Sequence, residues 1–251
     1  MDWTKRWDEF RQGAADCLNH LQPDELDYAS NISLQHRYIY VETAKVGCST
    51  IKKLLIKAEY GDLVDAKAAD HVHFRDFSPL LNAKQVGDFR EFVHREDIFS
   101  FCFVRNPYSR LLSAYLDKIA KQKPEHQELM IQLGYGPFSE KILSFEEFVN
   151  AVIDQPVLTM NTHWRTQYYA TFQHGITYDF IGRFESFEQD LRIAMDRIGI
   201  DMDTYYQVQA GHATHASQKL DAYYTPDLAE KVYRKYLIDF EHFSYPKELP
   251  G

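Results

Sequence analysis

The sequence feature that most constrains the fold is a strand, a short turn and a helix in immediate succession, an order that occurs three times. Residues 36–43 (HRYIYVET) are rich in β-branched and aromatic side chains, which predicts a strand, and residues 51–59 then carry apolar side chains at helical spacing. The continuous apolar run at 98–104 predicts a second, buried strand, and apolar residues at helical spacing follow it over 111–119.

The third unit is a predicted strand at 178–184 followed by a helix at 187–198, with Ser186 as its expected N-cap. Pro107 is expected at the first position of the second helix, where its missing N–H costs nothing. Strands that alternate with helices in this way form parallel sheets with helices on both faces. We therefore predict a three-layer α/β fold, a P-loop-like parallel sheet flanked by helices.

Residues 1–251 are expected to form a single domain, because the chain contains no internal repeat and no Gly/Ser linker. Apolar residues at helical spacing predict a helical lead-in over 1–30, and Ser144 reads as the cap of another helix. Residues 223–240 return to helical spacing, whereas 211–219 (GHATHASQK) are small and polar and predict a mobile loop.

Composition excludes several classes of protein. Hydrophobic residues make up 45% and charged residues 26%, so the chain is not disordered, and no apolar run of about 18 residues predicts a transmembrane segment. The net charge of -9 disfavours a nucleic-acid partner. An odd number of cysteines, 3, and a polar N-terminus without signal-peptide character favour a reducing, cytoplasmic localisation.

The turn at residues 44–50 (AKVGCST) has the composition of a phosphate-binding loop. Backbone N–H groups at the start of the following helix, the hydroxyls of Ser49 and Thr50 and the charge of Lys45 all suit an anion. The Walker A pattern is absent, because Lys45 precedes Gly47 instead of following a second glycine. The alternative is an ordinary strand–helix turn that carries a surface lysine.

A second candidate anion site follows the second predicted strand. Arg105 opens the segment RNPYSR and would emerge at the carboxyl end of that strand, where open α/β sheets bind ligands. Arg110 and Ser113 lie on the helix that follows, and guanidinium groups suit phosphate through paired donors. The alternative is an arginine that caps the sheet or pairs with an acid. Two separate phosphate sites predict a ligand that is phosphorylated at both ends.

Together these motifs resemble the sulfotransferases that use 3′-phosphoadenosine 5′-phosphosulfate (PAPS). TAKVGCSTIKKLL is similar to their 5′-phosphosulfate loop, and FVRNPYSRLLSAY to their 3′-phosphate motif R-x-P-x-x-R-x-x-S-x-Y. Residues 162–167 (THWRTQ) resemble the HWxPQ segment of the carbohydrate group (Golgi-type, sulfotransferase family 2), from which they depart at Thr166. The strand at 178–185 and the closing stretch at 236–245 also resemble that group, so the resemblance covers 36–246.

The carbohydrate group is membrane-anchored, and this chain shows no anchor. That difference favours a soluble, bacterial-like branch, or a chain trimmed of its anchor. The resemblance implies transfer of a sulfuryl group from PAPS to an acceptor hydroxyl, most simply that of a glycan. It implies no metal, and the sequence agrees, because it contains no CxxC and the spacing His71-x-His73 is too short to form a metal site alone.

The resemblance also assigns roles to individual residues. Lys45 matches the lysine that contacts the 5′ phosphosulfate, and Arg105 and Ser113 match the pair that holds the 3′ phosphate. The donor is also expected to contact the remaining turn residues, Val46, Gly47, Cys48, Ser49 and Thr50. Cys48 needs no redox role, since a small residue in the turn is sufficient.

The acceptor hydroxyl must lose its proton to a base, and histidine is the natural candidate. The segment at 70–74 (DHVHF) resembles a stretch around the catalytic histidine of heparan sulfate 2-O-sulfotransferases, which selects His71. The overlapping pattern VHxRxxSPL resembles bacterial relatives and selects His73, which we favour slightly. Two surface histidines without a role are the alternative.

Other residues are candidates on the substrate side. His163 is a third candidate for the base, after His73 and His71, and its place in the HW segment favours a structural or substrate-side role. The neighbouring Trp164 is expected to pack against a sugar or against the core. Thr214, Ser217 and Lys219 lie where relatives close over the nucleotide and acceptor, and they are candidates for phosphate contacts. The alternative is a loop that takes no part in binding. Two other functions remain open at this stage, a kinase-like or nucleotide-hydrolysing enzyme and a non-catalytic nucleotide-binding protein.

Overall fold

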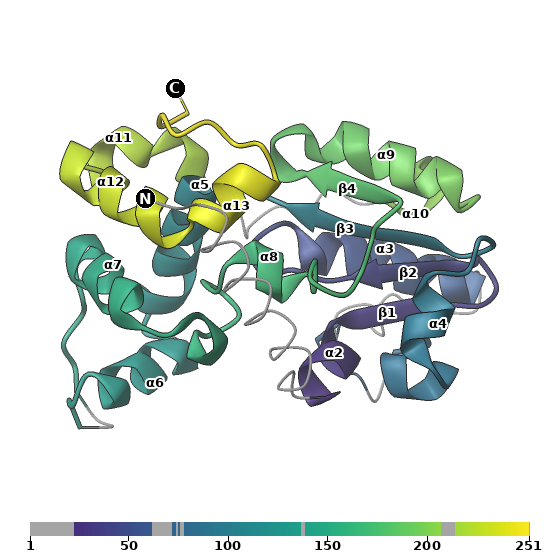
Figure 1. Ribbon diagram of the computed structural model, residues 1–251, viewed down its shortest axis with the longest axis horizontal. Coiled ribbons are helices and arrows are strands. Elements are labelled where there is room, and N and C mark those ends of the chain that lie inside the picture. The colour runs from purple at the N-terminus through teal and green to yellow at the C-terminus, as the bar shows by residue number, and fades with distance from the viewer. Residues whose placement is uncertain are drawn as a thin grey trace, which may run out of the picture.

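The computed structural model describes residues 23–61, 72–73, 75, 78–136, 139–206 and 214–250. Its centre is a sheet of four strands in the order β1 (Ser30–Ser33), β2 (Tyr38–Val41), β3 (Phe99–Val104) and β4 (Phe180–Arg183). Strands β2, β3 and β4 run parallel and are the three strands that the sequence predicted (Figure 1). The predicted α/β fold with a parallel sheet and flanking helices is confirmed.

Strand β1 corrects the predicted helical lead-in. Within that lead-in, residues 1–22 lie outside the described residues, and α2 (Pro23–Ala29) is helical as predicted. Ser30, however, begins a strand that pairs antiparallel with β2. The segment SNIS is too polar to read as a strand, yet all four residues are buried. Burial is possible because the hydroxyl of Ser30 and the amide of Asn31 donate to backbone carbonyls.

Helices cover both faces of the sheet. One face packs against α3 (Cys48–Tyr60), α9 (Phe187–Arg197) and α10 (Met202–Tyr205), around the aromatic rings that β2 and β3 contribute. The opposite face packs against α2 and α4 (Phe89–Val93). This is the layered arrangement that a parallel sheet requires, since both of its faces are apolar.

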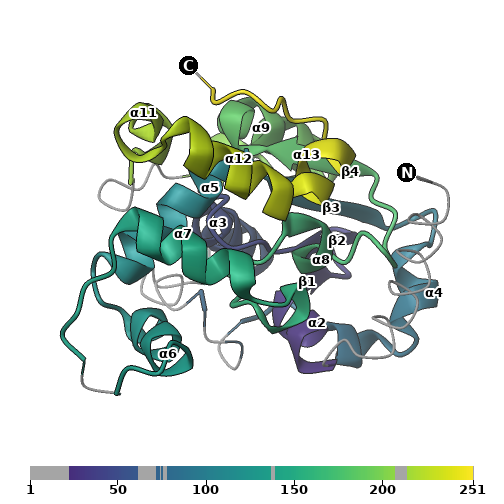
Figure 2. The ribbon, with the colours of Figure 1, turned by 60° about the vertical axis from the view of Figure 1, so that its left-hand side comes forward.

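A helical layer lies beside the carboxyl ends of the parallel strands (Figure 2). It has its own apolar core, to which all of its helices contribute. Its helices are α5 (Pro107–Ala114), the π-helical turn η5 (Tyr115–Ile119), α6 (Pro124–Gln132), α7 (Phe145–Asp154), α11 (Leu220–Tyr223), α12 (Pro226–Lys235) and α13 (Leu237–His242). The short helix α8 (Gln167–Ala170) contacts α13.

Most predicted helix boundaries are confirmed. Ser144 forms a capping box with α7, and Pro107 is the first residue of α5, which Asn106 caps. Ser186 precedes α9 as predicted, but its side chain makes no capping hydrogen bond. The single helix predicted over 223–240 is wrong in detail, because the chain breaks at Tyr236 between α12 and α13.

Two described segments contain helical turns that the sequence did not predict. The helix α6 was not predicted from the sequence. Of the predicted loop, residues 211–213 lie outside the described residues, and the 3-10 turn η8 (Ala216–Gln218) follows them. In the described part of the chain, none of the helices is long and apolar enough to cross a membrane.

Candidate functional site

The turn between β2 and α3 has a backbone shape that its sequence dictates. Gly47 is the N-cap of α3 and has a φ of 87°, in the left-handed region that favours glycine. A Cβ at this position would also lie 2.5 Å from the ring of Phe187. Cys48, Ser49 and Thr50 form the first turn of α3, so their N–H groups lie at the positive end of the helix.

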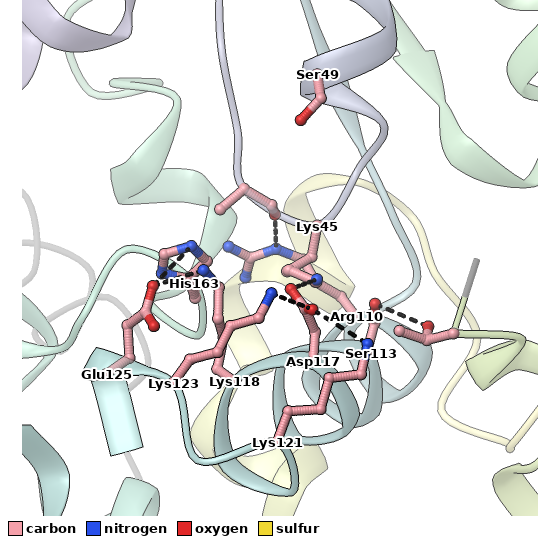
Figure 3. Close-up of polar contacts among 12 residues, drawn as sticks. Lys45, Ser49, Arg110, Ser113, Asp117, Lys118, Lys121, Lys123, Glu125 and His163 are labelled. Atoms are coloured by element: carbon pink, nitrogen blue, oxygen red, sulfur yellow. Dashed lines mark hydrogen bonds and ion pairs between the residues drawn. The ribbon is translucent and has the colours of Figure 1, made fainter. Parts of the chain in front are cut away.

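Lys45 in this turn pairs with Asp117 from the π-helical turn η5. Its Nζ lies 2.7 Å from Oδ2 of Asp117, while Oδ1 accepts from Lys123 at 2.7 Å (Figure 3). Burial lowers the pKa of Lys45, and the hydrogen bond to Asp117 raises it part of the way back. Burial also opposes ionisation of Asp117, but hydrogen bonds from Lys123 and Lys45 hold the pKa of that carboxyl well below its usual range.

A second ion pair lies beside the first. Lys118 pairs with Glu125 at 2.5 Å, and Nε2 of His163 lies 3.6 Å from the same carboxylate. Nδ1 of His163 donates to Oδ1 of Asn161 at 2.8 Å. Burial and the charge of Lys118 lower the pKa of His163 to about 3, so its imidazole is neutral at pH 7. Figure 3 shows His163 on the same side of the site as Lys118 and Glu125.

Arg105 lies at the carboxyl end of β3, as predicted, and its guanidinium is buried. It donates to Ser109 at 2.9 Å, to Ser217 at 3.2 Å and to the carbonyl of Lys45 at 3.3 Å, and it stacks on the ring of Phe184 at 4.2 Å. Burial lowers its pKa to about 10, so the group stays protonated at pH 7. Among the described residues, no carboxylate lies within ion-pair distance of this guanidinium.

The segment after residue 213 reaches the same place. The hydroxyl of Thr214 lies 3.1 Å from that of Ser113, and Lys219 donates to the carbonyl of Thr214 at 3.2 Å. Two hydroxyls from this segment, those of Thr214 and Ser217, therefore touch the two residues that match the 3′-phosphate motif. The structure brings together Lys45, Arg105, Ser113 and the segment from Thr214 to Lys219.

The backbone of Arg105 is fixed by residues that the sequence did not single out for this purpose. The side-chain amide of Gln167 bonds both the N–H and the carbonyl of Arg105, each at 2.8 Å. Asp239 in turn accepts from the N–H groups of Gln167 and Tyr168 at the start of α8. Burial raises the pKa of Asp239 to about 6.

Arg110 connects the two anion motifs to the HW segment. Its guanidinium is buried and donates to three carbonyls, those of Ala44 at 2.9 Å, Arg165 at 2.6 Å and Thr162 at 3.0 Å. One buried side chain thus fixes the Lys45 turn, α5 and the segment at 162–165 relative to one another. Guanidinium suits this role because its five donors lie in a rigid plane.

This geometry agrees with the comparison of the sequence with known families. The profile of the Sulfotransferase family matches residues 29–246, which include both anion motifs and every strand of the sheet. The chain belongs to the sulfotransferase family. No solved structure shows a significant match.

Curated relatives of this chain include carbohydrate sulfotransferases. Carbohydrate sulfotransferase 14 of Danio rerio is 31% identical over 250 residues, covering 91% of this chain and 65% of the relative. The Homo sapiens protein of that name is 27% identical, with 86% and 59% covered, and carbohydrate sulfotransferase 12 of Mus musculus is 25% identical, with 92% and 61% covered. The chain therefore spans about three fifths of the length of these relatives.

The candidate base His73 lies against the phosphate turn of this sulfotransferase-family chain. Its Nε2 is 3.0 Å from Oγ of Ser49, and its Nδ1 is 3.5 Å from the hydroxyl of Tyr28. Burial, Lys52 and Lys118 lower the pKa of His73 to about 4, so the imidazole is neutral at pH 7. His71 lies outside the described residues.

Other predicted site residues lie in the core. Trp164 is 1% exposed, packs edge-on against Phe148 and donates to Gln155, so its ring has no face toward solvent. Val46 is fully buried, and burial raises the pKa of the Cys48 thiol, which keeps it neutral. The described part of the chain contains no cluster of three or more side chains that could hold a metal ion.

Proposed function

We propose that this chain transfers a sulfuryl group from PAPS to an acceptor hydroxyl, most simply on a carbohydrate. The observation that carries the proposal is the buried guanidinium of Arg105, which contacts hydroxyls and a carbonyl but, among the described residues, no carboxylate. The charge of Glu185 favours the protonated form of this guanidinium, but no ion pair joins the two groups. A buried cation without a direct ion pair is costly, and a phosphate would complete its pairing. The guanidinium donates directly to the Lys45 turn, so two anion-binding groups are adjacent.

PAPS has the matching charges, a 3′ phosphate at one end and a phosphosulfate at the other. Arg105 and Ser113, with Thr214 and Ser217 beside them, would hold the 3′ phosphate. Lys45 and the N–H groups of the first turn of α3 would hold the 5′ phosphosulfate, which helix N-termini suit. This use of PAPS rests on the motifs and on membership of the family.

The reaction would be an in-line displacement at sulfur. The acceptor oxygen forms a bond to the sulfur while the bond from sulfur to the 5′-phosphate oxygen breaks, and 3′,5′-ADP leaves. Lys45 stabilises the negative charge that develops on that oxygen, and a histidine takes the proton from the acceptor hydroxyl. His73 is our preferred base, since it is neutral and lies beside the phosphate turn.

The carbohydrate acceptor is inferred from the relatives, whose names describe carbohydrate sulfotransferases. We assign His163 to the acceptor side, and what supports this role is its position next to Glu125 and near the charges of Lys118 and Lys45. Trp164 supports this region from the core and does not stack on a sugar.

The donor assignment is tested by thermal shift with 3′,5′-ADP, 5′-AMP and ATP with Mg²⁺. A ligand at 100 times its Kd adds about 2.7 kcal/mol to the free energy of unfolding. We expect 3′,5′-ADP to raise the Tm by roughly 5 to 10 °C and 5′-AMP to raise it much less.

The matched control is Arg105→Ala. It should reduce the shift from 3′,5′-ADP to that from 5′-AMP, since it removes the proposed 3′-phosphate contact. A shift with ATP alone would favour the kinase-like alternative. Binding of 3′,5′-ADP without transfer to any glycan acceptor would favour a non-catalytic protein.

A further inference from the structure

The carboxylate of Asp117 contacts Lys45 of the turn between β2 and α3, and it lies among several lysines. Asp117 pairs with Lys45 and Lys123 at 2.7 Å each, and Lys121 lies 3.7 Å away (Figure 3). The side chains of Lys45 and Asp117 are 14% and 18% exposed, so water screens this pair only weakly. No motif of the sequence analysis accounts for Asp117.

The position of Asp117 follows from an irregular helix. The helix α5, which carries Ser113, continues into the π-helical turn η5, where the N–H of Ala120 bonds the carbonyl of Tyr115 at 2.9 Å. Such turns are rare, and they occur frequently at functional sites. One continuous helical segment therefore carries a residue of the 3′-phosphate motif and the partner of the phosphosulfate lysine.

We propose that Asp117 is a positioning residue for Lys45, whose ammonium it holds before the donor binds and then shares with the phosphosulfate of the donor. This inference rests on the proposed function. Sharing between the two anions keeps the buried ammonium paired at every stage, which avoids the cost of leaving it alone. Asp117 thereby competes with the donor for the Lys45 ammonium and also orients this ammonium toward the phosphosulfate.

The charges around Lys45 determine the direction in which loss of the Asp117 carboxylate changes nucleotide binding and turnover. Burial and Lys118 disfavour the charged form of Lys45, whereas Asp117 and the Cys48 thiol favour it, and Lys45 in turn disfavours protonation of His163. Removal of the carboxylate charge should therefore have two opposite effects. Binding of an anionic nucleotide should become tighter near pH 7, because the nucleotide no longer competes with Asp117 for Lys45. Turnover should become slower, because Asp117 no longer orients the Lys45 ammonium.

A double-mutant cycle between Asp117→Asn and Lys45→Ala tests the proposal. The Kd of 3′,5′-ADP is measured by calorimetry and kcat in a transfer assay, with circular dichroism to verify folding. With Lys45 present, we expect Asp117→Asn to tighten 3′,5′-ADP about three- to tenfold and to lower kcat about tenfold. In the Lys45→Ala background, the change in Kd should disappear.

Two further variants act as controls. Asp117→Glu keeps the charge and should restore much of kcat. Glu125→Gln removes a carboxylate from the same cluster that pairs with Lys118 instead of Lys45, so it should show no coupling to Lys45→Ala. If Asp117→Asn fails to fold, Asp117→Ser removes the same charge with a smaller side chain, and it should show the same signs.

The outcomes separate the two proposals. Equal changes in Kd with and without Lys45, or no change in either background, would overturn the role of Asp117. Absence of 3′,5′-ADP binding by the unmodified protein would instead contradict the proposed function itself, and the role of Asp117 with it.

Discussion

At the residue scale, His73 is the group whose proposed role is easiest to separate from binding. Its imidazole has a pKa of about 4, so it is unprotonated at pH 7 and able to accept a proton. His73→Ala should lower kcat by about 10²- to 10⁴-fold, which is the usual contribution of a general base. The Kd of 3′,5′-ADP should stay within about twofold, because His73 contacts the turn only through Ser49.

The pH profile of the unmodified protein gives a second readout. A base must be unprotonated, so kcat/KM falls as the pH drops through the pKa of that base. With His73 as the base, kcat/KM should stay level down to about pH 5 and fall only near pH 4. A histidine with the ordinary pKa of about 6.5 would make kcat/KM fall at a higher pH. His71→Ala is the matched control, and its inactivity beside an active His73→Ala would move the base to His71.

Single residues were predictable where their chemistry coincided with a motif. Lys45 and Arg105 stand out because each follows a strand and carries a charge suited to phosphate. Asp117 did not stand out, although it lies four residues after Ser113, about one helical turn further along the same face. Gln167 and Asp239 lie in the segments at 162–167 and 236–245 that resemble the family, but the sequence does not reveal that they act on Arg105, because they do so through backbone groups.

At the scale of elements, the connection between β2 and α3 depends on one glycine. Gly47→Ala should cost about 2–4 kcal/mol, since a left-handed φ is unfavourable for alanine and the added Cβ would meet the ring of Phe187. We expect a lower Tm and loss of the 3′,5′-ADP shift, because Cys48, Ser49 and Thr50 follow this residue directly.

The matched control is Gly199→Ala, at a residue that also has a positive φ but has no atom within 4 Å of the added Cβ. It should cost only the backbone strain of about 1–2 kcal/mol and leave nucleotide binding intact. Equal losses of stability for the two variants would mean that the contact with Phe187 has no effect on the turn.

Elements with strong patterns were predicted, and those with weak patterns were not. β3 and α9 combine apolar content with the correct period, so sequence alone places them within about two residues. β1 is mostly polar, and its burial depends on its pairing with β2 and on the bridge between Ile32 and Leu81. Its existence therefore depends on tertiary pairing, which local patterns do not contain.

At the scale of the whole molecule, the site joins segments that are distant in sequence. A chain of hydrogen bonds runs from Asp239 in α13 through Gln167 at the start of α8 to the backbone of Arg105 after β3. The helical layer thus holds the backbone of Arg105 in place, and Asp239 and Gln167 both lie within the residues 29–246 that the family profile matches.

This connection predicts how stability depends on pH. Burial raises the pKa of Asp239 from 3.8 to about 6 in the folded protein, so the folded state binds an extra proton between these values. Asp239 therefore contributes about 3 kcal/mol of stability that is fully present below pH 4 and is lost as the pH rises through 6.

Urea unfolding of the unmodified protein and of Asp239→Asn from pH 4 to 7.5 measures this pH-dependent contribution. The free energy of unfolding of the unmodified protein, relative to that of the variant, should rise as the pH falls. A difference that is constant with pH would show that Asp239 ionises in the fold as it does in the unfolded chain.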